Sequence, residues 1–309
     1  MDNRIIYTEN PIDRASLLRK DEAWIKAQIN ARNGYVLLLK EKKALVHQDM
    51  GVNTILTQLD DKLASYADQL TFLGRENNEP VFALDLSDQN EDEVYNLVGD
   101  GEFQNLRGTS SILKPNQASL LAYALGLFNW KATYRYCYRC GAKLRYQETG
   151  HVKVCTNSSC GHITYPRTDP AVIVLIEHHA ENGEAPKCLL ARNKRYKGNM
   201  ISTLAGFVEP GETPEHAVVR EMKEEVGLDV DNIRYLGSQP WPFPASLMLG
   251  FMASSASLNI QLDDDEIQYA QWYTAKELVD LSATGDLVLS GKDSIARFMI
   301  NQWIKRHLT

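Results

Sequence analysis

The segment 206–228 constrains the fold of this chain more than any other, because it encodes a capped helix with an unusual charge. It holds six carboxylates in 23 residues. Thr213 is a good N-cap residue, and Pro214 suits the first helical position. Gly227 is placed to end the helix, since glycine readily adopts the left-handed conformation found there. The sequence therefore predicts a helix over residues 214–226.

Three of these carboxylates, Glu221, Glu224 and Glu225, fall on one face of the predicted helix, within an arc of about 100°. Clustered carboxylates repel one another unless a cation lies between them. Oxygen ligands at this density suit Mg²⁺ or Mn²⁺, which also bind substrate phosphates. The alternative is a solvated acidic face in which Arg220 pairs with Glu224 one turn away. That alternative does not explain the sequence of the loop before the helix.

The same segment resembles the Nudix box, G-x5-E-x7-R-E-U-x-E-E-x-G-U, in which U is a bulky apolar residue. Every specified position is filled, by Gly206, Glu212, Arg220, Glu221, Met222, Glu224, Glu225, Gly227 and Leu228. Nudix hydrolases cleave a nucleoside diphosphate that is linked to another group. The resemblance therefore implies a hydrolase that requires a divalent metal.

The resemblance also implies roles for individual residues. Glu221 and Glu225 match metal ligands, the carbonyl of Ala205 matches a further ligand, and Glu224 lies close beside them. A later acidic loop resembles one in the family and adds Glu266 as a fourth catalytic carboxylate. Either Glu225 or Glu266 is expected to be the general base. The residues expected to support the box are Gly206, Glu212, Arg220 and Gly227.

Four of the five cysteines form a C-x2-C-x14-C-x4-C pattern, made by Cys137, Cys140, Cys155 and Cys160. Thiolates with this spacing can converge on one Zn²⁺, and Gly141 and Gly161 suit the tight turns required. A zinc site closed by four thiolates has a structural role. Disulfides are the alternative, and the absence of a secretory signal argues against them. Cys188 stands in an apolar run and is predicted to be a buried, inert thiol.

A proline-rich stretch, Ser238–Ser246, reads Ser-Gln-Pro-Trp-Pro-Phe-Pro-Ala-Ser. Its three alternate prolines exclude a central strand and stiffen the segment. Trp241 and Phe243 on such a segment could stack on a flat heteroaromatic ring, or could simply pack into the core. The stretch resembles the S-Q-P-W-P-F-P-x-S signature of the NADH pyrophosphatase family of Nudix enzymes. That family also carries a four-cysteine zinc ribbon and a further N-terminal domain.

The resemblance to the NADH pyrophosphatase family covers nearly the whole chain and implies a set of substrate-binding residues. This set comprises Tyr165, Phe207, Gln239, Pro240, Trp241, Pro242, Phe243, Pro244, Ala245, Ser246 and Ala296, with Arg107 as a looser match. The implied reaction is hydrolysis of NAD(H) to NMN(H) and AMP, with Mg²⁺ or Mn²⁺ as the catalytic cation.

Three other functions remain open from the sequence. The same chemistry could remove an NAD cap from the 5′ end of RNA, since that linkage is also a dinucleotide diphosphate. A broader hydrolase of ADP-ribose or dinucleoside polyphosphates is the second. The third is a zinc-ribbon protein that binds nucleic acid and carries an inactive Nudix fold, although the complete set of carboxylates argues against it.

The element pattern predicts an α+β chain with three parts. We expect an N-terminal domain over 1–130, a zinc ribbon over 131–165 and a Nudix domain over 166–309, in which a mixed sheet lies between helices. Predicted strands cover 34–40, 80–86, 171–177, 187–192, 232–238, 246–253 and 268–273. Predicted helices cover 117–130, 214–226 and 293–306. The letters alone do not establish an internal repeat between the first and last thirds.

Composition limits the partners and the compartment. The chain has 309 residues and a formal net charge of −7, which argues against broad phosphate-backbone binding as its main role. It shows neither a secretory signal nor an apolar run of about 18 residues. We therefore expect a cytoplasmic protein without a membrane partner. We also expect NADH or NAD⁺ as substrate, with NAD-capped RNA as a further candidate, and a homodimer. The N-terminal domain is expected either to help build the dimer or to frame the pocket.

Overall fold

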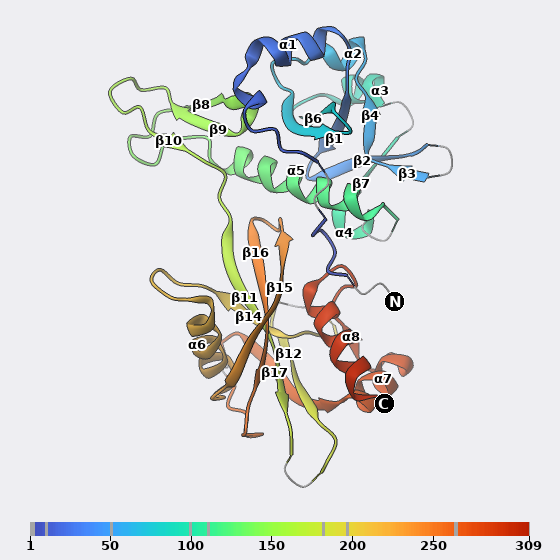
Figure 1. The fold of residues 1–309 in the computed structure, drawn as a ribbon, viewed down its shortest axis with the longest axis vertical. Helices are drawn as coiled ribbons and strands as arrows, with labels where there is room; N and C mark the ends of the chain where they lie inside the picture. The colour runs from blue at the N-terminus through green and yellow to red at the C-terminus, as the bar shows by residue number, and fades with distance from the viewer. Residues whose placement is uncertain are drawn as a thin grey trace. The chain divides into compact units, whose positions relative to one another are not determined.

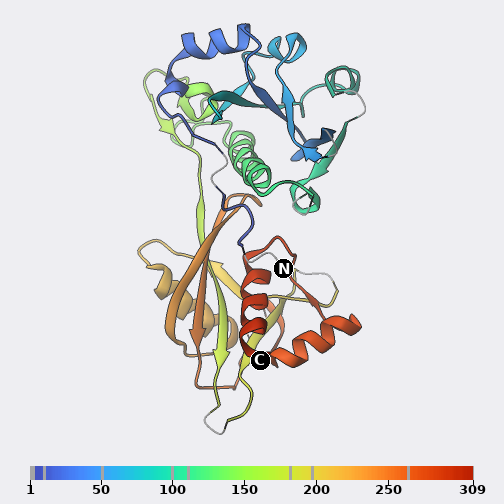
Figure 2. The ribbon, with the colours of Figure 1, turned by 45° about the vertical axis from the view of Figure 1, so that its right-hand side comes forward.

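The computed structural model describes residues 4–9, 12–49, 52–98, 101–109, 112–180, 183–195, 198–262 and 265–308. The chain forms two compact units (Figures 1 and 2). One comprises Met1–Ile6, Asp169–Pro240 and Ser246–Thr309, and the other comprises Tyr7–Thr168 and Trp241–Ala245. In the described parts of the chain, no helix combines the length and the apolar character needed to cross a bilayer.

The unit with the acidic helix is built on a six-stranded mixed sheet. Its strands are β11 (Asp169–His178), β12 (Lys187–Asn193), β14 (Leu204–Phe207), β15 (Asp231–Trp241), β16 (Ser246–Ser254) and β17 (Ile267–Thr274). The sheet order is β15-β16-β11-β12-β17. Strand β11 runs parallel to β16 on one side. On its other side it pairs antiparallel, first with β14 and then with β12.

Helices cover both faces of this sheet. They are α6 (Pro214–Val226), α7 (Ala275–Thr284) and α8 (Ile295–His307), and a short parallel pair joins β13 (Met200–Ile201) to β18 (Val288–Leu289). Alternate side chains of β11 point to opposite faces. Val172 and Val174 pack in the core with α6, whereas Ile173 and Leu175 pack in the core with α8. The prediction of a mixed sheet between helices is confirmed.

Most predicted elements of this unit match the structure to within one or two residues, but one strand is longer than expected. β15 continues to Trp241, so the start of the proline-rich stretch belongs to a strand and not to a loop. β15 is an edge strand of the sheet, where the missing N–H of Pro240 is tolerated.

The second unit contains a seven-stranded sheet of order β3-β2-β1-β6-β5, with β4 beside β1 and β7 beside β2. The strands are β1 (Tyr35–Lys40), β2 (Lys43–Asp49), β3 (Val52–Thr54), β4 (Leu56–Gln58), β5 (Thr71–Glu76), β6 (Glu79–Asp85) and β7 (Glu102–Asn105). The helices are η1 (Leu18–Lys20), α1 (Glu22–Asn30), α2 (Asp61–Ala64), α3 (Glu91–Val98), α4 (Leu106–Thr109) and α5 (Pro115–Thr133).

Strand pairing reveals the repeat that the letters did not establish. β1 runs parallel to β6, as β11 does to β16. The first half of β1 pairs with β4 and its end pairs with β2, as β11 pairs with β14 and then β12. The helix after β4 is α2, which has four residues, whereas α6 has 13. The second unit therefore repeats the sheet without the acidic helix.

The cysteine-rich segment of the second unit forms a small three-stranded sheet. Its strands are β8 (Leu144–Gln147), β9 (Val152–Cys155) and β10 (Ile163–Thr164), in the sheet order β10-β9-β8. The short helix η2 (Glu148–Gly150) connects β8 to β9. All pairings are antiparallel. The two turns that carry the cysteine pairs extend from this sheet.

Candidate active site and metal centre

The ends of α6 lie where the capping residues predict. The Thr213 hydroxyl accepts a hydrogen bond from the backbone N–H of His216 at 3.2 Å. Gly227 adopts the left-handed conformation (φ 70°), and its N–H donates to the carbonyls of Met222 and Lys223. Val218, Met222 and Val226 are buried against the sheet, so the neighbouring face of α6 presents the glutamates.

The Arg220 side chain forms hydrogen bonds with several carboxylates of the acidic cluster. Its guanidinium donates two hydrogen bonds to Glu212, at 2.7 and 2.9 Å, which forms a bidentate pair. The same group donates to Glu221 at 2.9 Å and to Glu224 at 3.0 Å. It also donates to the carbonyl of Phe207 at 2.9 Å, which ties the preceding loop to the helix. The pairing with Glu224 that the sequence allowed is therefore one part of a larger network.

The network changes the protonation of its members. The Arg220 side chain, together with the backbone N–H of Glu209, lowers the pKa of Glu212 to about 2. Hydrogen bonding to Glu212 raises the pKa of Arg220 in turn. Burial raises the pKa of Glu221, and the charges of Glu224 and Glu266 act in the same direction. Glu266 immediately precedes β17, so a carboxylate from outside α6 contributes to the raised pKa of Glu221.

The remaining residues of the acidic cluster differ in exposure. Glu225 is only 6% exposed, whereas Glu224 faces solvent. Glu266 is half-exposed, and its carboxylate lies 3.8 Å from the guanidinium of Arg195. Ala205 lies in β14, opposite Ile173 of β11. The four carboxylates thus comprise one buried, one half-buried and two exposed side chains.

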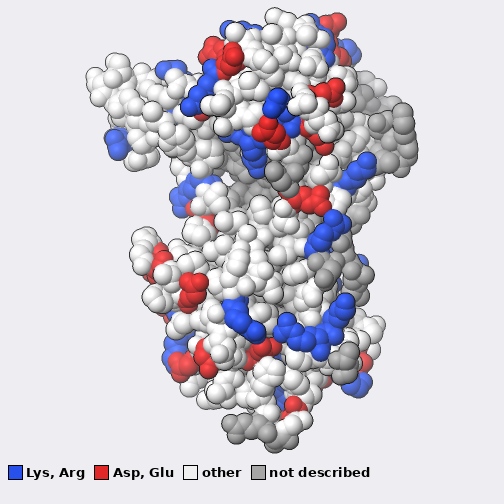
Figure 3. All heavy atoms as spheres, viewed as in Figure 1, with Lys and Arg blue, Asp and Glu red and all other residues white. Residues whose placement is uncertain are grey.

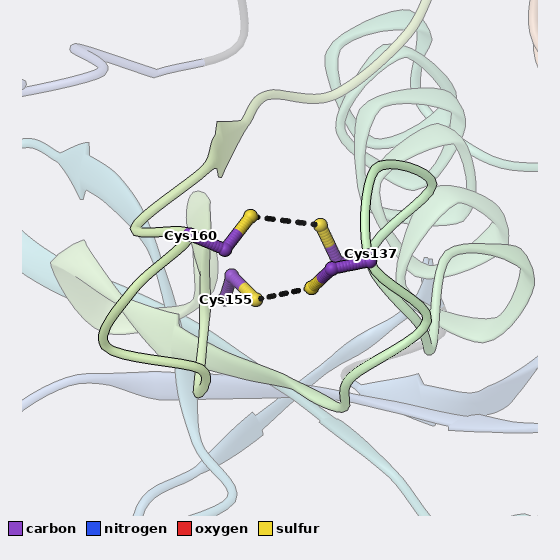
Figure 4. Close-up of side chains that lie close together, drawn as sticks. Cys137, Cys155 and Cys160 are labelled. Atoms are coloured by element: carbon purple, nitrogen blue, oxygen red, sulfur yellow. Dashed lines mark hydrogen bonds between the residues drawn. The ribbon is translucent and has the colours of Figure 1, made fainter.

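The four cysteines of the ribbon converge as their spacing predicts (Figure 4). Their sulfur atoms all lie within 4.8 Å of one another. Cys137 Sγ lies 3.8 Å from Cys160 Sγ, and Cys140 Sγ lies 3.4 Å from Cys155 Sγ. These distances are far longer than an S–S bond, and all five cysteines are free thiols. In the described ranges, no other group of three or more His, Cys, Asp or Glu side chains is gathered so closely.

Backbone N–H groups point at three of the sulfurs. The N–H of Ala142 donates to Cys140 and lowers the pKa of that thiol to about 7. The N–H groups of Asn157 and His162 act in the same direction on Cys155 and Cys160, but burial and the neighbouring thiols outweigh them. The pKa of Cys155 is raised to about 12, and that of Cys160 is also raised. The set can therefore hold a metal ion.

The turns of the ribbon depend on two glycines. Gly141 and Gly161 have φ values of 73° and 56°, which favour glycine at both positions. Cys188 takes no part in the cluster. It is buried in β12, and burial raises the pKa of its thiol, as expected for an inert core residue.

The proline-rich stretch places its two aromatic side chains together. The rings of Trp241 and Phe243 lie 5.0 Å apart and nearly perpendicular. The guanidinium of Arg107 lies 5.0 Å from the Trp241 ring and 4.6 Å from the Phe243 ring. The weak sequence match at Arg107 therefore identified a residue that the fold does bring to this stretch.

One residue that sequence reasoning missed anchors the same stretch. Asn129 of α5 donates from Nδ2 to the carbonyls of Pro242 and Pro244, at 2.9 and 3.0 Å. An asparagine inside a helix carries no sequence signal for such a contact, because its partners are more than 110 residues away.

The other expected substrate residues fall into two classes. Tyr165 and Phe207 expose large aromatic surfaces, at 63% and 59%. Gln239 and Ala296, in contrast, are buried. The Gln239 amide donates to the carbonyls of Ile6 and Asp293, and its oxygen accepts from the N–H of Ile295. Both donors of Gln239 are thus committed to the backbone, so the structure favours a bracing role for this side chain.

Comparison with known proteins decides the family. The NUDIX domain profile matches residues 167–297, and the NADH pyrophosphatase-like rudimentary NUDIX domain profile matches residues 33–130. The NAD-capped RNA hydrolase NudC of Pseudomonas aeruginosa (strain LESB58) is 39% identical over 234 residues, which covers 76% of each chain. The chain belongs to the Nudix family.

Further Nudix relatives differ in length from this chain. An NAD-capped RNA hydrolase of Homo sapiens is 37% identical over 202 residues, which cover 62% of this chain but only 43% of the human protein. The chain therefore spans less than half the length of that relative. A solved Nudix hydrolase from Nitrosomonas europaea has 23% identity and a TM-score of 0.43, covering 56% of this chain and 93% of its own.

Proposed function

We propose that this Nudix protein hydrolyses the diphosphate bond of NAD(H) to give NMN(H) and AMP, with a divalent metal. The observation that carries the proposal is the carboxylate cluster held by Arg220, in which Glu212, Glu221 and Glu224 share one guanidinium. The rudimentary NADH pyrophosphatase-like domain over 33–130 supports a dinucleotide substrate. The names of the NudC relatives, which are NAD-capped RNA hydrolases, support the NAD-linked diphosphate.

Glu221, Glu225, Glu266 and the carbonyl of Ala205 are the proposed ligands of the catalytic metal. The donor set consists of oxygen atoms only, which fits Mg²⁺ or Mn²⁺. The raised pKa of Glu221, to which Glu224 and Glu266 contribute, fits a site where negative charges gather. A divalent cation bound by these oxygens supplies positive charge that neutralises the diphosphate and makes its phosphorus easier to attack.

Other side chains of the site have positioning and acid–base roles. Arg220 and Glu212 fix the position of Glu221, since the guanidinium bonds to both carboxylates. Glu225 and Glu266 are the two candidates for the general base that takes a proton from the attacking water. They differ in exposure, because Glu225 is buried and Glu266 is half-exposed. Comparing the pH profiles of Glu225→Gln and Glu266→Gln distinguishes the two assignments.

The ribbon is proposed to bind one structural Zn²⁺. Four thiolates complete a tetrahedral shell and leave no open position for chemistry. The N–H groups that point at Cys140, Cys155 and Cys160 stabilise the thiolates that a metal ion requires.

Trp241 and Phe243, with Arg107 against both rings, are proposed to recognise the nicotinamide half of the substrate. Their perpendicular packing and the nearby guanidinium hold the aromatic surfaces in fixed orientations. Tyr165, Phe207, Ala296 and residues 239–246 complete the proposed substrate set, with Gln239 acting through its backbone contacts.

A second candidate substrate is NAD-capped RNA, since the relatives at 37–39% identity are named as NAD-capped RNA hydrolases. Hydrolysis of ADP-ribose or dinucleoside polyphosphates is the broader alternative. The deciding experiment measures kcat/KM for NADH, NAD⁺, ADP-ribose and NAD-capped RNA side by side, with Mg²⁺ and with Mn²⁺. Equal turnover of ADP-ribose and NADH would overturn the dinucleotide assignment. If no substrate is turned over, the remaining candidate is a zinc-ribbon protein that binds nucleic acid and carries an inactive Nudix fold.

We also propose the domain boundaries 1–130, 131–165 and 166–309, and a homodimer to which the N-terminal domain contributes. The matched ranges 33–130 and 167–297 support the first and last domains. Sedimentation of the full chain tests the dimer.

A further inference from the structure

The cysteine ribbon differs in charge from the rest of the chain. Residues 131–165 contain six Lys and Arg but a single acidic residue, Glu148, whereas the whole chain has a net charge of −7. Glu148 lies 3.5 Å from the Nζ of Lys20, outside the ribbon. In Figure 3 the lobe at the upper left, over β8–β10, carries blue side chains and no red ones on the side shown. The ribbon is therefore a local positive region on an acidic protein.

Two of the six cations are turned inward. Lys153 of β9 is 2% exposed, and its Nζ donates to the carbonyls of Lys131 and Tyr134 at the end of α5. Tyr146 pairs with Lys153 across the sheet, and the Lys131 and Lys153 ammonium groups lie 4.6 and 4.9 Å from its ring. Residues paired directly across an antiparallel sheet share one face. This face of the ribbon sheet therefore packs on α5.

The opposite face carries a different set of side chains. Tyr136 lies opposite Lys143, between the hydrogen bonds Cys137 N–H to Ala142 and Leu144 N–H to Arg135. Such a non-hydrogen-bonded pair brings the two side chains closest together. Arg145 lies two residues after Lys143, so both point to the same side.

Across the strands, Arg145 pairs with Val154, and Val154 pairs with Ile163. The outer ribbon face is therefore Tyr136, Lys143, Arg145, Val154 and Ile163. Tyr136 is 59% exposed and Ile163 is 46% exposed, and both cations face solvent.

We propose that the outer ribbon face binds a single-stranded RNA chain. A base stacks on the Tyr136 ring, Lys143 and Arg145 bind the flanking phosphates, and Val154 and Ile163 provide an apolar surface for a neighbouring base or ribose. An exposed aromatic ring between cations is the arrangement that single-stranded nucleic acids use, because every base has a stackable face and every nucleotide carries a negative charge. The proposed RNA contact depends only on the residues of the outer ribbon face. The further statement that the bound RNA carries the cleaved NAD group at its 5′ end rests on the proposed function.

The test measures binding of a fluorescein-labelled, uncapped 12-nucleotide RNA by fluorescence anisotropy, without added Mg²⁺ or Mn²⁺. Lys143→Glu/Arg145→Glu should weaken binding at least tenfold and should lower the salt slope, d log K/d log[salt], by about 1.4, the loss of about two phosphate contacts on a single strand. Tyr136→Leu, which keeps an apolar side chain, should weaken binding about tenfold with an unchanged salt slope.

The matched control is Lys276→Glu/Lys305→Glu, which makes the same change in net charge on exposed helix positions of the other unit. An equal loss in this control would show that bulk charge, and not the outer ribbon face, binds the RNA. Binding that survives both ribbon variants would overturn the proposal, and so would a poly-glutamate peptide that competes as well as RNA of equal charge. The zinc content of each variant verifies that its ribbon is folded. If the charge-reversed variant Lys143→Glu/Arg145→Glu loses zinc, the neutral variant Lys143→Gln/Arg145→Gln is measured in its place.

Catalysis separates this proposal from the proposed function. The ribbon variants should keep kcat/KM for NADH within about twofold of the wild type, while kcat/KM for NAD-capped RNA falls with the RNA affinity. Wild-type protein that binds RNA but hydrolyses no NADH would refute the proposed function and leave the outer ribbon face intact. Wild-type protein that hydrolyses NADH but binds no RNA would refute RNA binding by the outer ribbon face and leave the proposed function intact.

Discussion

The α-carbon of Gly206 lies directly against the carboxylate of Glu221. A β-carbon built on Gly206 would lie 1.9 Å from Glu221 Cδ and 2.1 and 2.3 Å from its two carboxylate oxygens. No side chain fits in that space. Gly206, the first glycine of the Nudix box, thus leaves room for the Glu221 side chain of α6, and it does so from β14, the strand that also carries Ala205.

Gly206→Ala should therefore affect activity more than stability. The clashing atoms are the far end of a flexible side chain, so the new methyl group displaces the Glu221 carboxylate and leaves the backbone in place. We expect kcat/KM for NADH to fall at least tenfold, about 1.4 kcal/mol in the barrier, with a melting temperature within about 2 °C of the wild type. In a double-mutant cycle, Gly206→Ala should add little to Glu221→Gln. Full additivity would show that the two residues act independently.

The parts of the site that the sequence predicted are those with local signals. Thr213, Pro214 and Gly227 fix the ends of α6 through contacts within a few residues, and the caps form as expected. The cysteine pairs lie in short turns, so their spacing alone indicates convergence. Strands β11 and β12 follow from apolar runs that are buried on both faces.

The parts that the sequence did not predict depend on contacts between distant residues. The repeated sheet is visible only in which strand pairs with which, because the shared feature is topology and not residue identity. Gln239 reads as a substrate residue in the proline-rich stretch, yet its partners are Ile6, Asp293 and Ile295. Asn129 likewise reads as an ordinary helix residue until the fold brings Pro242 and Pro244 to it.

Arg220→Lys should destabilise the protein in a pH-dependent way. A lysine cannot reproduce the bidentate pair, so the pKa of Glu212 in the folded state should rise from about 2 toward its ordinary value of 4.5. A carboxyl group with a lowered folded-state pKa contributes stability that is fully present above about pH 4.5 and is lost as the pH falls toward 2. The melting temperature of the variant should thus fall below the wild type by about 3 °C or more at pH 7, and the difference should shrink below pH 4.5.

Lys223→Met is the matched control for Arg220→Lys, since it removes an exposed ion pair with Asp229 from the same helix. Exposed pairs contribute little, so the melting curve of this control should follow the wild type at every pH. A difference between Arg220→Lys and the wild type that stays constant from pH 7 to pH 2.5 would contradict the role assigned to Glu212.

Glu225→Gln should lower kcat by about a hundredfold or more, on the order of 3 kcal/mol in the barrier, while the fold remains intact. Neutralising one carboxylate of the cluster relieves repulsion in the metal-free protein, so the melting temperature should stay the same or rise. Glu215→Gln, at an exposed position in the first turn of the same helix, is the control and should retain wild-type turnover. Near-wild-type turnover in Glu225→Gln would remove this residue from the proposed site.

Cys137→Ser should abolish zinc binding and destabilise the ribbon, because metal binding and local folding are coupled. The purified wild type should contain about one zinc per chain, from one set of four thiolates. Cys188→Ala changes a cysteine outside the cluster and should keep the full zinc content. Elemental analysis and thermal unfolding of the wild type, Cys137→Ser and Cys188→Ala test this prediction. A wild type that contains no zinc would refute the assignment of the four cysteines as a zinc site.

Trp241→Ala should make the enzyme less selective between NADH and ADP-ribose. The two substrates share the ADP-ribosyl diphosphate and differ in the nicotinamide-bearing half, which Trp241, Phe243 and Arg107 are proposed to recognise. Loss of one stacked aromatic contact is worth about 0.5–1.5 kcal/mol, so the ratio of kcat/KM values should shift by about two- to tenfold against NADH. Tyr95→Ala removes an exposed aromatic ring from α3 and should leave the ratio unchanged.

The competing role for Trp241 is structural, since Tyr7 packs on its ring and Arg107 lies against it. If the ring only braces that unit, Trp241→Ala should lower the melting temperature and reduce kcat/KM for both substrates by the same factor. Asn129→Ala separates the two roles, because it removes the two hydrogen bonds that anchor the stretch and leaves both rings in place. A recognition role for the ring requires that Trp241→Ala shift the substrate ratio more than Asn129→Ala does, at equal loss of melting temperature.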